Sequence, residues 1–319
     1  MRQREKPTDK NDTLMTHTRK TSPSSKLTPR LKPSMLSACM RLMRLDKPIG
    51  IFLVLWPALW ALWIAAEGVP PWPELFVFVV GAIVMRSAGC VINDYADRKI
   101  DGHVSRTKHR PLVNGELSPR FALGLFVSLL IVALILVSLT NLMTILTATG
   151  AAALTAIYPY MKRHTYLPQV VLGAAFAWAV PMAFAAITQT LPKPMWTLYI
   201  GVVIWTIVYD TFYAMVDRED DLKIGVKSTA ILFADNDRII TGCLQVFVLL
   251  VLIMVGNSFA LQWPYYLSLT GVALLFVYQQ CLIRTRQRAA CFSAFLNNNW
   301  VGMLIFVGIA ASYMLPNTV

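Results

Sequence analysis

The chain has 319 residues, of which 56% are hydrophobic and only 14% are charged. Its mean hydropathy of +0.55 lies outside the range of an ordinary soluble domain, so the sequence predicts a membrane protein. The formal charge of +12 does not indicate a nucleic-acid partner, because the basic residues are scattered between apolar runs instead of forming one soluble face. The five cysteines show no paired spacing, so neither a zinc site nor a disulfide framework is expected.

Residues 1–34 are polar and cannot bury enough apolar surface to offset the entropy of ordering. We expect a disordered tail there, with a transit peptide as the alternative, followed by one membrane domain over 35–319. From residue 49 the chain alternates apolar runs near membrane-spanning length with short polar breaks. The pattern predicts an all-α, polytopic fold with about nine transmembrane helices at 49–66, 74–92, 121–138, 141–157, 168–187, 196–213, 239–256, 264–283 and 298–315.

The distribution of basic residues predicts the orientation. With nine spans and the N-terminus inside, all but two of the 29 Lys and Arg residues fall on one side, the exceptions being Arg86 and Lys193. Loops rich in these residues stay cytoplasmic, so the long loops 93–120 and 214–238 are expected to form a cytoplasmic cap over a central cavity. We expect a bacterial inner membrane, with the mitochondrial inner membrane as the alternative.

The first polar motif emerges from the second predicted span. Asn93, Asp97 and Asp101 are spaced four apart, and each such step on an α-helix turns the side chain by only about 40°. Arg86, seven residues earlier, shares their face. An arginine inside a span is costly unless it faces a polar cavity, so Arg86 is predicted to lie on an active-site wall, with a structural ion pair as the alternative.

A second motif repeats this geometry at the end of the sixth span. Asp210, Tyr213, Asp217 and Asp221 follow at steps of three and four, which keep one helical face. Tyr213 suits a hydrogen bond to a phosphate, although tyrosine is also common at membrane interfaces. A calcium-loop interpretation of this run fails because Leu222 stands where the turn glycine is required.

Two sets of carboxylates on one membrane face, each followed by cations, fit a diphosphate held through Mg²⁺, which prefers oxygen ligands. The expected metal ligands are Asn93, Asp97 and Asp101 for one ion, and Asp217 and Asp221 for the other. The cations expected to pair with the remaining phosphate charge are Arg106, Lys108, Arg110, Lys223 and Lys227.

Two other interpretations compete with a diphosphate site. The acids could simply solvate helix ends and pair with nearby cations, but two matched motifs on one side disfavour this. In a cation transporter the carboxylates should lie near the bilayer midplane, whereas these lie at the ends of the spans.

Five stretches carry a family resemblance: RLDKPIG (44–50), NDYADRKIDGHVSRTKHRPL (93–112), YPYMKR (158–163), LPQVVLGAAFAWAVPMAF (167–184) and DTFYAMVDREDD (210–221). The chain resembles the UbiA superfamily of intramembrane prenyltransferases over roughly 40–315, and within it the branch that prenylates 4-hydroxybenzoate in ubiquinone biosynthesis. The resemblance implies nine spans around a central cavity and Mg²⁺-dependent transfer of a polyprenyl group from polyprenyl diphosphate to the ring.

The resemblance also implies roles for individual residues. Asn93, Asp97, Asp101, Asp217 and Asp221 would bind the metal diphosphate. Arg44 would meet the carboxylate of the acceptor, and Asp210 is the candidate base for the ring proton. Another aromatic acceptor, such as homogentisate or dihydroxynaphthoate, is the nearest alternative. The small residues of LGAAFAWAV (172–180) are predicted to let helices separate or approach closely, which would suit a groove for the isoprenoid.

Overall fold

The computed structural model describes residues 34–103 and 106–316, which form helices joined by short connections and contain no strand. The predicted tail of residues 1–34 lies outside the described residues, except for Ser34, whose hydroxyl accepts a hydrogen bond from the Ser37 N–H and caps the first helix. In chain order the helices are α1 Met35–Leu42, α2 Ile49–Ala65, α3 Trp72–Asp97, η1 Asp101–His103, α4 Pro119–Ser138, α5 Leu142–His164, α6 Pro168–Ala177, α7 Ala179–Thr188, α8 Lys193–Ile224, α9 Thr229–Phe233, η2 Ala234–Asn236, α10 Asp237–Ser258, α11 Trp263–Leu282, η3 Ile283–Thr285 and α12 Arg288–Met314.

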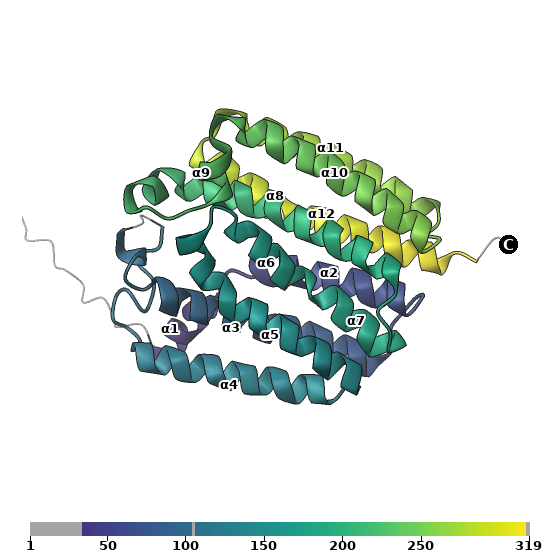
Figure 1. The fold of residues 1–319 in the computed structure, drawn as a ribbon, viewed down its shortest axis with the longest axis horizontal. Helices are drawn as coiled ribbons and strands as arrows, with labels where there is room; N and C mark the ends of the chain where they lie inside the picture. The colour runs from purple at the N-terminus through teal and green to yellow at the C-terminus, as the bar shows by residue number, and fades with distance from the viewer. Residues whose placement is uncertain (1–33, 104–105, 317–319) are drawn as a thin grey trace, which may run out of the picture. The chain divides into compact units, whose positions relative to one another are not determined.

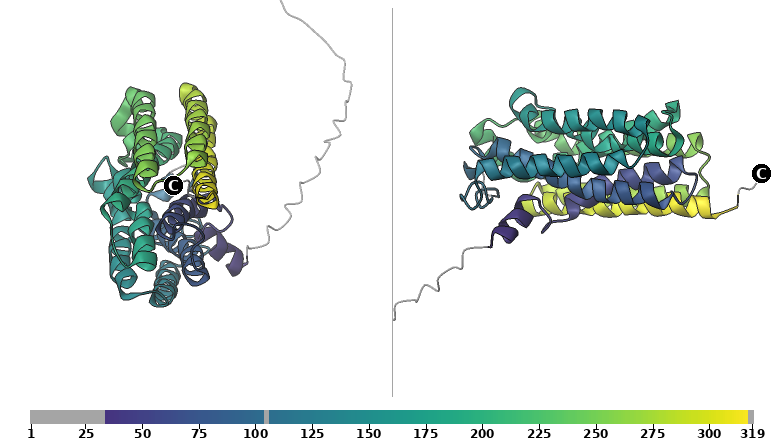
Figure 2. Two further views of the ribbon diagram at one scale, coloured as in Figure 1. Left: turned by 90° about the vertical axis from the view of Figure 1, so that its right-hand side faces the viewer. Right: turned by 90° about the horizontal axis from the view of Figure 1, so that it is seen from below.

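The expectation of about nine membrane-spanning helices is confirmed. Eight helical segments of the described chain are long and apolar enough to cross a bilayer, with α6 and α7 together making one of them. The ninth is α2, an apolar helix of 17 residues. Figure 1 shows these long helices running side by side along the length of the bundle, and Figure 2 shows them grouped when viewed near their ends.

Local sequence sets where the helices begin and end. Several of them begin with proline in the first turn, where its missing N–H has no intrahelical partner to lose. Before α4, the Ser118 hydroxyl accepts a hydrogen bond from the Phe121 N–H at 3.1 Å. Helix α8 ends at Ile224, and the next residue, Gly225, caps it with a left-handed φ of +73° and an N–H that donates to the Asp221 carbonyl. Asp221 therefore occupies the last turn of a long helix.

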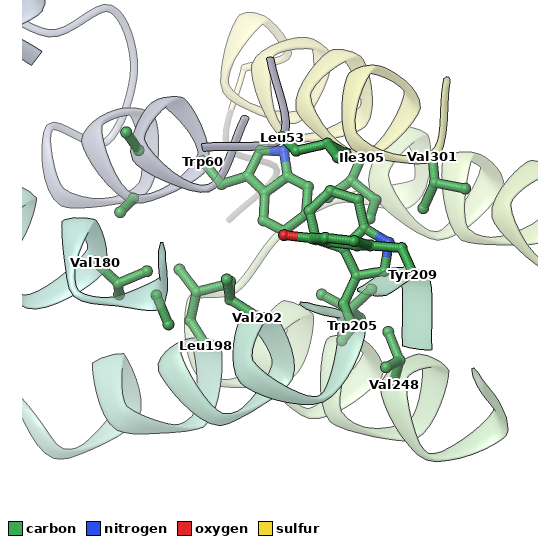
Figure 3. Packing of buried hydrophobic residues seen from close by; sticks show 14 of the residues in the cluster. Leu53, Trp60, Val180, Leu198, Val202, Trp205, Tyr209, Val248, Val301 and Ile305 are labelled. Atoms are coloured by element: carbon green, nitrogen blue, oxygen red, sulfur yellow. The ribbon is translucent and has the colours of Figure 1, made fainter. Parts of the chain in front are cut away.

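The core is built on aromatic side chains between α2, α8 and α12 (Figure 3). The rings of Trp60 and Trp205 lie 5.2 Å apart between centroids, and both side chains are fully buried. The Trp60 indole N–H donates to the Gly302 carbonyl at 3.0 Å, and that of Trp205 donates to Asn298 at 2.9 Å. Because both indoles are paired, they add apolar area without leaving a buried donor unsatisfied.

The short helices gather at one end of the bundle, on the left of Figure 1, where α1, α9 and the connection between α3 and α4 lie. Helices α3 and α8 reach that end with Asp97 and Ile224. The expected cap therefore consists mainly of the segments that follow these two helices, together with α1. The acidic residues of α3 and α8 lie at the base of this cap, and Asp101 belongs to the cap itself.

Candidate active site

A cavity of about 840 Å³ lies among α2, α3, α5, α6 and α8 and carries most of the residues singled out in the sequence. Its lining includes Arg44, Arg86, Asn93, Asp97, Asp101, Arg106, Arg110, Asp210, Tyr213, Asp217, Asp221 and Lys227. Two predicted cations, Lys108 and Lys223, are exposed and do not belong to this lining. Residues separated by more than a hundred positions thus face one space.

The first acidic motif is only partly helical. Helix α3 ends at Asp97, and the Ile100 N–H donates to the Asp97 carbonyl at 2.7 Å as the chain turns into η1. The expectation that Asn93, Asp97 and Asp101 share one helical face is therefore wrong for Asp101. The turn nonetheless returns Asp101 to the cavity, where its side chain and that of Asp97 are largely buried.

The second motif lies entirely on α8, as its spacing predicts. Asp217 and Asp221 face the cavity, whereas Glu219 and Asp220 lie on another side of the helix and bind Arg288 at 2.8 and 3.2 Å. The acidic residues of 217–221 therefore point to two sides of α8. One side faces the cavity, and the other forms ion pairs with α12.

Arg106 lies in the segment between α3 and α4, and its side chain binds two residues of α8. Its Nε lies 3.0 and 3.1 Å from the two Asp217 carboxylate oxygens, and its Nη1 donates to the Tyr213 hydroxyl at 2.5 Å. Its Cζ also lies 4.6 Å from the centroid of the Tyr213 ring. Burial opposes the charged form, but Tyr213 and Asp217 outweigh it and raise the pKa of the guanidinium, so Arg106 stays cationic.

Asp94 lines the cavity, and the spacing argument missed it. It is 2% exposed and accepts from Arg44 at 3.1 and 3.2 Å, while Arg110 lies 2.9 Å away. Arg110 also binds Asp101 at 2.5 Å. Asp94 follows Asn93 directly and so falls outside the four-residue spacing of Asn93, Asp97 and Asp101. The only signal in the sequence was an aspartate at the end of a span, before a loop rich in arginine.

The oxygen ligands fit a divalent metal that is shared with a phosphate group. Within the described ranges, no three His, Cys, Asp or Glu side chains converge closely enough to hold an ion by themselves. Mg²⁺ in phosphate sites is usually bound by one or two carboxylates, with phosphate and water completing the shell, so facing pairs of carboxylates are sufficient. Burial raises the pKa of the Asp101 carboxyl; Arg110 opposes this rise, and Asp94 and Asp97 add to it.

Arg86 lies on the cavity wall with an unsatisfied group. Its Nε is buried without a hydrogen-bond partner, and its Cζ lies 5.7 Å from the Phe176 ring centroid. A Cβ added at Gly50 would fall 2.4 Å from this Nε, so the glycine of RLDKPIG provides the space for the guanidinium. Across 34–103 and 106–316 no carboxylate is paired with Arg86, which favours the cavity-wall interpretation over a structural ion pair.

The small residues of 172–180 serve mainly for packing. A Cβ at Gly173 would lie 2.8 Å from the Val203 carbonyl oxygen, so the glycine permits close approach of α6 to α8. Ala177 is fully buried. Neither residue lines the cavity, although Leu172, Ala175 and Phe176 do. The segment was predicted to let helices either separate or approach closely. The contact of Gly173 supports close approach, and it does not support a groove at this glycine.

The sequence and the fold were compared with those of known proteins. Residues 54–307 match the UbiA prenyltransferase family. A 4-hydroxybenzoate octaprenyltransferase of Saccharophagus degradans is 59% identical over 95% of this chain and 100% of its own length, and one of an Enterobacter species is 56% identical over 87% and 96%. Among solved structures, a UbiA homolog of Aeropyrum pernix has a TM-score of 0.73 at 22% identity, covering 83% of this chain and 98% of its own. A UbiA homolog of Archaeoglobus fulgidus bound to GPP and Mg²⁺ has a TM-score of 0.67 at 17% identity over 88% and 100%.

Proposed function

The chain belongs to the UbiA prenyltransferase family, and from that premise we propose that it transfers a polyprenyl group from polyprenyl diphosphate to 4-hydroxybenzoate. The new bond forms at the ring carbon ortho to the hydroxyl, as a step of ubiquinone biosynthesis. The observation that carries the proposal is the convergence of two acidic motifs, two loop arginines and Arg86 on one cavity within a membrane bundle. The relatives named for this activity, which match nearly the whole chain, support the choice of acceptor.

The charged end of the cavity suits the diphosphate. Asn93, Asp97 and Asp101 would hold one Mg²⁺ ion, and Asp217 and Asp221 a second. When bound, Mg²⁺ neutralises diphosphate charge and makes it a better leaving group.

The cap supplies cations for the remaining phosphate charge. Arg106 and Arg110 already lie among the carboxylates, so their guanidinium N–H groups can donate to phosphate oxygens at short range. Tyr213 and Lys227 complete the polar lining. Lys108 and Lys223 are exposed outside it, so they would act on the anionic donor only through long-range electrostatic attraction.

The acceptor carboxylate suits Arg86 better than Arg44. Arg44 is engaged by Asp94, and it adopts a left-handed φ of 59° at the end of the turn that follows α1. Arg86 offers a buried donor that lacks a partner. A bound carboxylate would satisfy that donor and would be oriented by it. We therefore reassign the carboxylate contact, which the resemblance gave to Arg44, to Arg86.

The reaction needs a nucleophilic ring and a proton acceptor. The donor C–O bond breaks with its electron pair leaving on the diphosphate, and the ring carbon activated by the phenol attacks the resulting allylic cation. The displaced ring proton passes to a base, for which Asp210 is our candidate because it lines the cavity on α8, seven residues before Asp217. The low dielectric of the bundle strengthens each of these interactions.

The test is prenylation of radiolabelled 4-hydroxybenzoate by membranes that carry the wild-type chain or Asp97→Ala, with geranyl diphosphate and Mg²⁺. Product that depends on Mg²⁺ and disappears in the variant supports the reaction. If folded wild-type protein prenylates homogentisate or dihydroxynaphthoate but not 4-hydroxybenzoate, the acceptor is wrong and the family assignment alone stands.

We also propose that the protein lies in a bacterial inner membrane with its N-terminus and active site facing the cytoplasm. The bacterial relatives and the distribution of Lys and Arg support this orientation. Labelling of Lys223→Cys by a membrane-impermeant maleimide in intact spheroplasts tests it, with the native chain as the control for its own exposed cysteines. The label that the variant adds should appear only after lysis.

A further inference from the structure

Helices α10 and α11 are joined by a short connection and run antiparallel along one edge of the bundle (Figure 1). Near the cap they are in contact, since a Cβ added at Gly242 on α10 would lie 3.7 Å from the Gln280 side chain on α11. Arg238, in the first turn of α10, and Arg284, in η3, each lie four residues beyond this contact toward the cap. Two arginines therefore flank the cap end of the α10–α11 seam, the line along which the two helices meet.

The neighbouring arginines are held by carboxylates of the protein. Arg218 and Arg286 both bind Asp237, at 3.4 and 2.8 Å, and this carboxylate is fully buried. Arg288 binds two acidic residues of α8 at 2.8 and 3.2 Å. The charge of these three arginines is thus balanced within the bundle, so they are not available to a ligand.

Arg238 and Arg284 have no such partners. In the part of the chain that the structure describes, no ion pair joins either guanidinium to a carboxylate, and the exposed Asp235 makes none with Arg238 although it lies three residues away. The Arg238 Nε is also buried without a hydrogen-bond acceptor among the described residues. Because a buried donor that lacks a partner is unfavourable, an acceptor supplied by a ligand would stabilise this site.

The surface that continues from these two arginines is apolar. Ile239 and Val246 lie seven residues apart on α10, as do Val277 on α11 and Arg284 just after it, so each pair lies nearly along one line of its helix. Each of the three apolar residues is more than half exposed. Both helices are long and apolar enough to cross a bilayer, and the arginines lie at their ends, where the headgroups of a bilayer begin.

We propose that the cap end of the α10–α11 seam binds an anionic phospholipid. The guanidinium groups of Arg238 and Arg284 bind the lipid phosphate, and an acyl chain lies along Ile239, Val246 and Val277. An anionic headgroup suits two unpaired cations, whereas a choline headgroup carries a positive charge of its own that opposes them. A free phosphate ion would leave the apolar stripe unused, so we assign the ligand as a lipid. Neither arginine lines the central cavity, so the inference is independent of the proposed reaction.

Native mass spectrometry of the full chain in detergent tests the proposal, with phosphatidylglycerol as the anionic lipid and phosphatidylcholine as the zwitterionic one. Wild-type protein should bind one phosphatidylglycerol more tightly than phosphatidylcholine. Arg238→Gln and Arg284→Gln should each raise the apparent Kd for phosphatidylglycerol about fivefold, and the double variant about 30-fold. Arg120→Gln is the matched control and should leave this Kd unchanged. Arg120 is an exposed arginine in the first turn of α4, on the opposite edge of the bundle from the seam (Figure 1).

Equal binding of the two lipids by the wild type, or an equal loss of binding in Arg120→Gln, would overturn the proposal. All variants should keep the wild-type unfolding temperature in lipid-free detergent, because neither seam arginine forms an ion pair with a described carboxylate. A lower temperature for Arg238→Gln or Arg284→Gln would assign these arginines to the fold and would also overturn the lipid site.

The unfolding temperature also separates a lipid from a free anion. Phosphatidylglycerol should raise it in the wild type and not in the double variant, since a ligand that binds only the folded protein stabilises it. Inorganic phosphate at the same concentration should raise it in neither. A matching rise with inorganic phosphate would show an anion site in which the acyl chain plays no part, and the assignment of a lipid would be wrong.

Discussion

The assignment of the acceptor carboxylate to Arg86 makes a quantitative prediction for Arg86→Gln. Among the described residues the Arg86 Nε has no hydrogen-bond acceptor, so the loss of the guanidinium should fall on the bound substrate and not on the fold. Removing one partner of a buried, hydrogen-bonded charge pair costs about 2–5 kcal/mol. The cavity is large and partly lined by charged groups, so the arginine and the carboxylate would not be fully desolvated. The expected loss therefore lies near the lower end, at about 2–3 kcal/mol or roughly 30- to 150-fold in kcat/KM for 4-hydroxybenzoate.

The assay measures kcat/KM for 4-hydroxybenzoate at saturating geranyl diphosphate, with the methyl ester of the acceptor as a probe that lacks the carboxylate. Arg86→Gln should reduce turnover of the acid far more than turnover of the ester. Arg86→Lys, which keeps the charge but not the planar guanidinium, should give an intermediate loss. If Arg44→Gln shows the carboxylate-specific loss and Arg86→Gln affects acid and ester alike, the reassignment is refuted and Arg44 holds the carboxylate.

Three further predictions follow from the cavity and its supports. Asp97→Ala should abolish prenylation, and a chelator should do the same to the wild type until Mg²⁺ is restored; activity that survives the chelator would contradict a metal site. Arg106→Ala should raise the KM for the donor well above the modest change expected for Lys223→Ala, because only Arg106 lines the cavity, and equal effects would count against its contact with the diphosphate. Asp237→Asn should lower the apparent unfolding temperature in detergent, because this fully buried carboxylate binds Arg286 at 2.8 Å. The expected loss in the free energy of unfolding is about 2–3 kcal/mol, reduced because the arginine is partly exposed. An unchanged unfolding temperature would show that the pair contributes nothing.

The spans and the acidic motif on α8 could be read from the sequence because each depends on local pattern. Apolar runs of near-spanning length predicted helices, and the structure has a helix at each of them. Helices α3, α5, α8 and α12 nevertheless extend several residues beyond the predicted runs at one end. The steps of three and four from Asp210 to Asp221 predicted a common face because α8 continues as a helix to Ile224. The same argument failed at Asp101, because α3 ends at Asp97. A turn after the helix, and not the helical period, brings the Asp101 side chain to the cavity.

The sequence by itself determined the membrane class and the candidate residues for a diphosphate site, because composition, helical period and motif spacing are properties of neighbouring positions. The family followed from the resemblance of five stretches to known members and from the comparisons. Tertiary structure decided which of these residues meet. It placed Arg106 on Asp217, engaged Arg44 with Asp94 and left Lys223 outside the cavity. These contacts depend on how helices far apart in the chain pack against one another, and no period within a single helix encodes that packing. The space that Gly50 leaves for the Arg86 guanidinium has the same origin, since a glycine in a sequence does not reveal which side chain lies beside it.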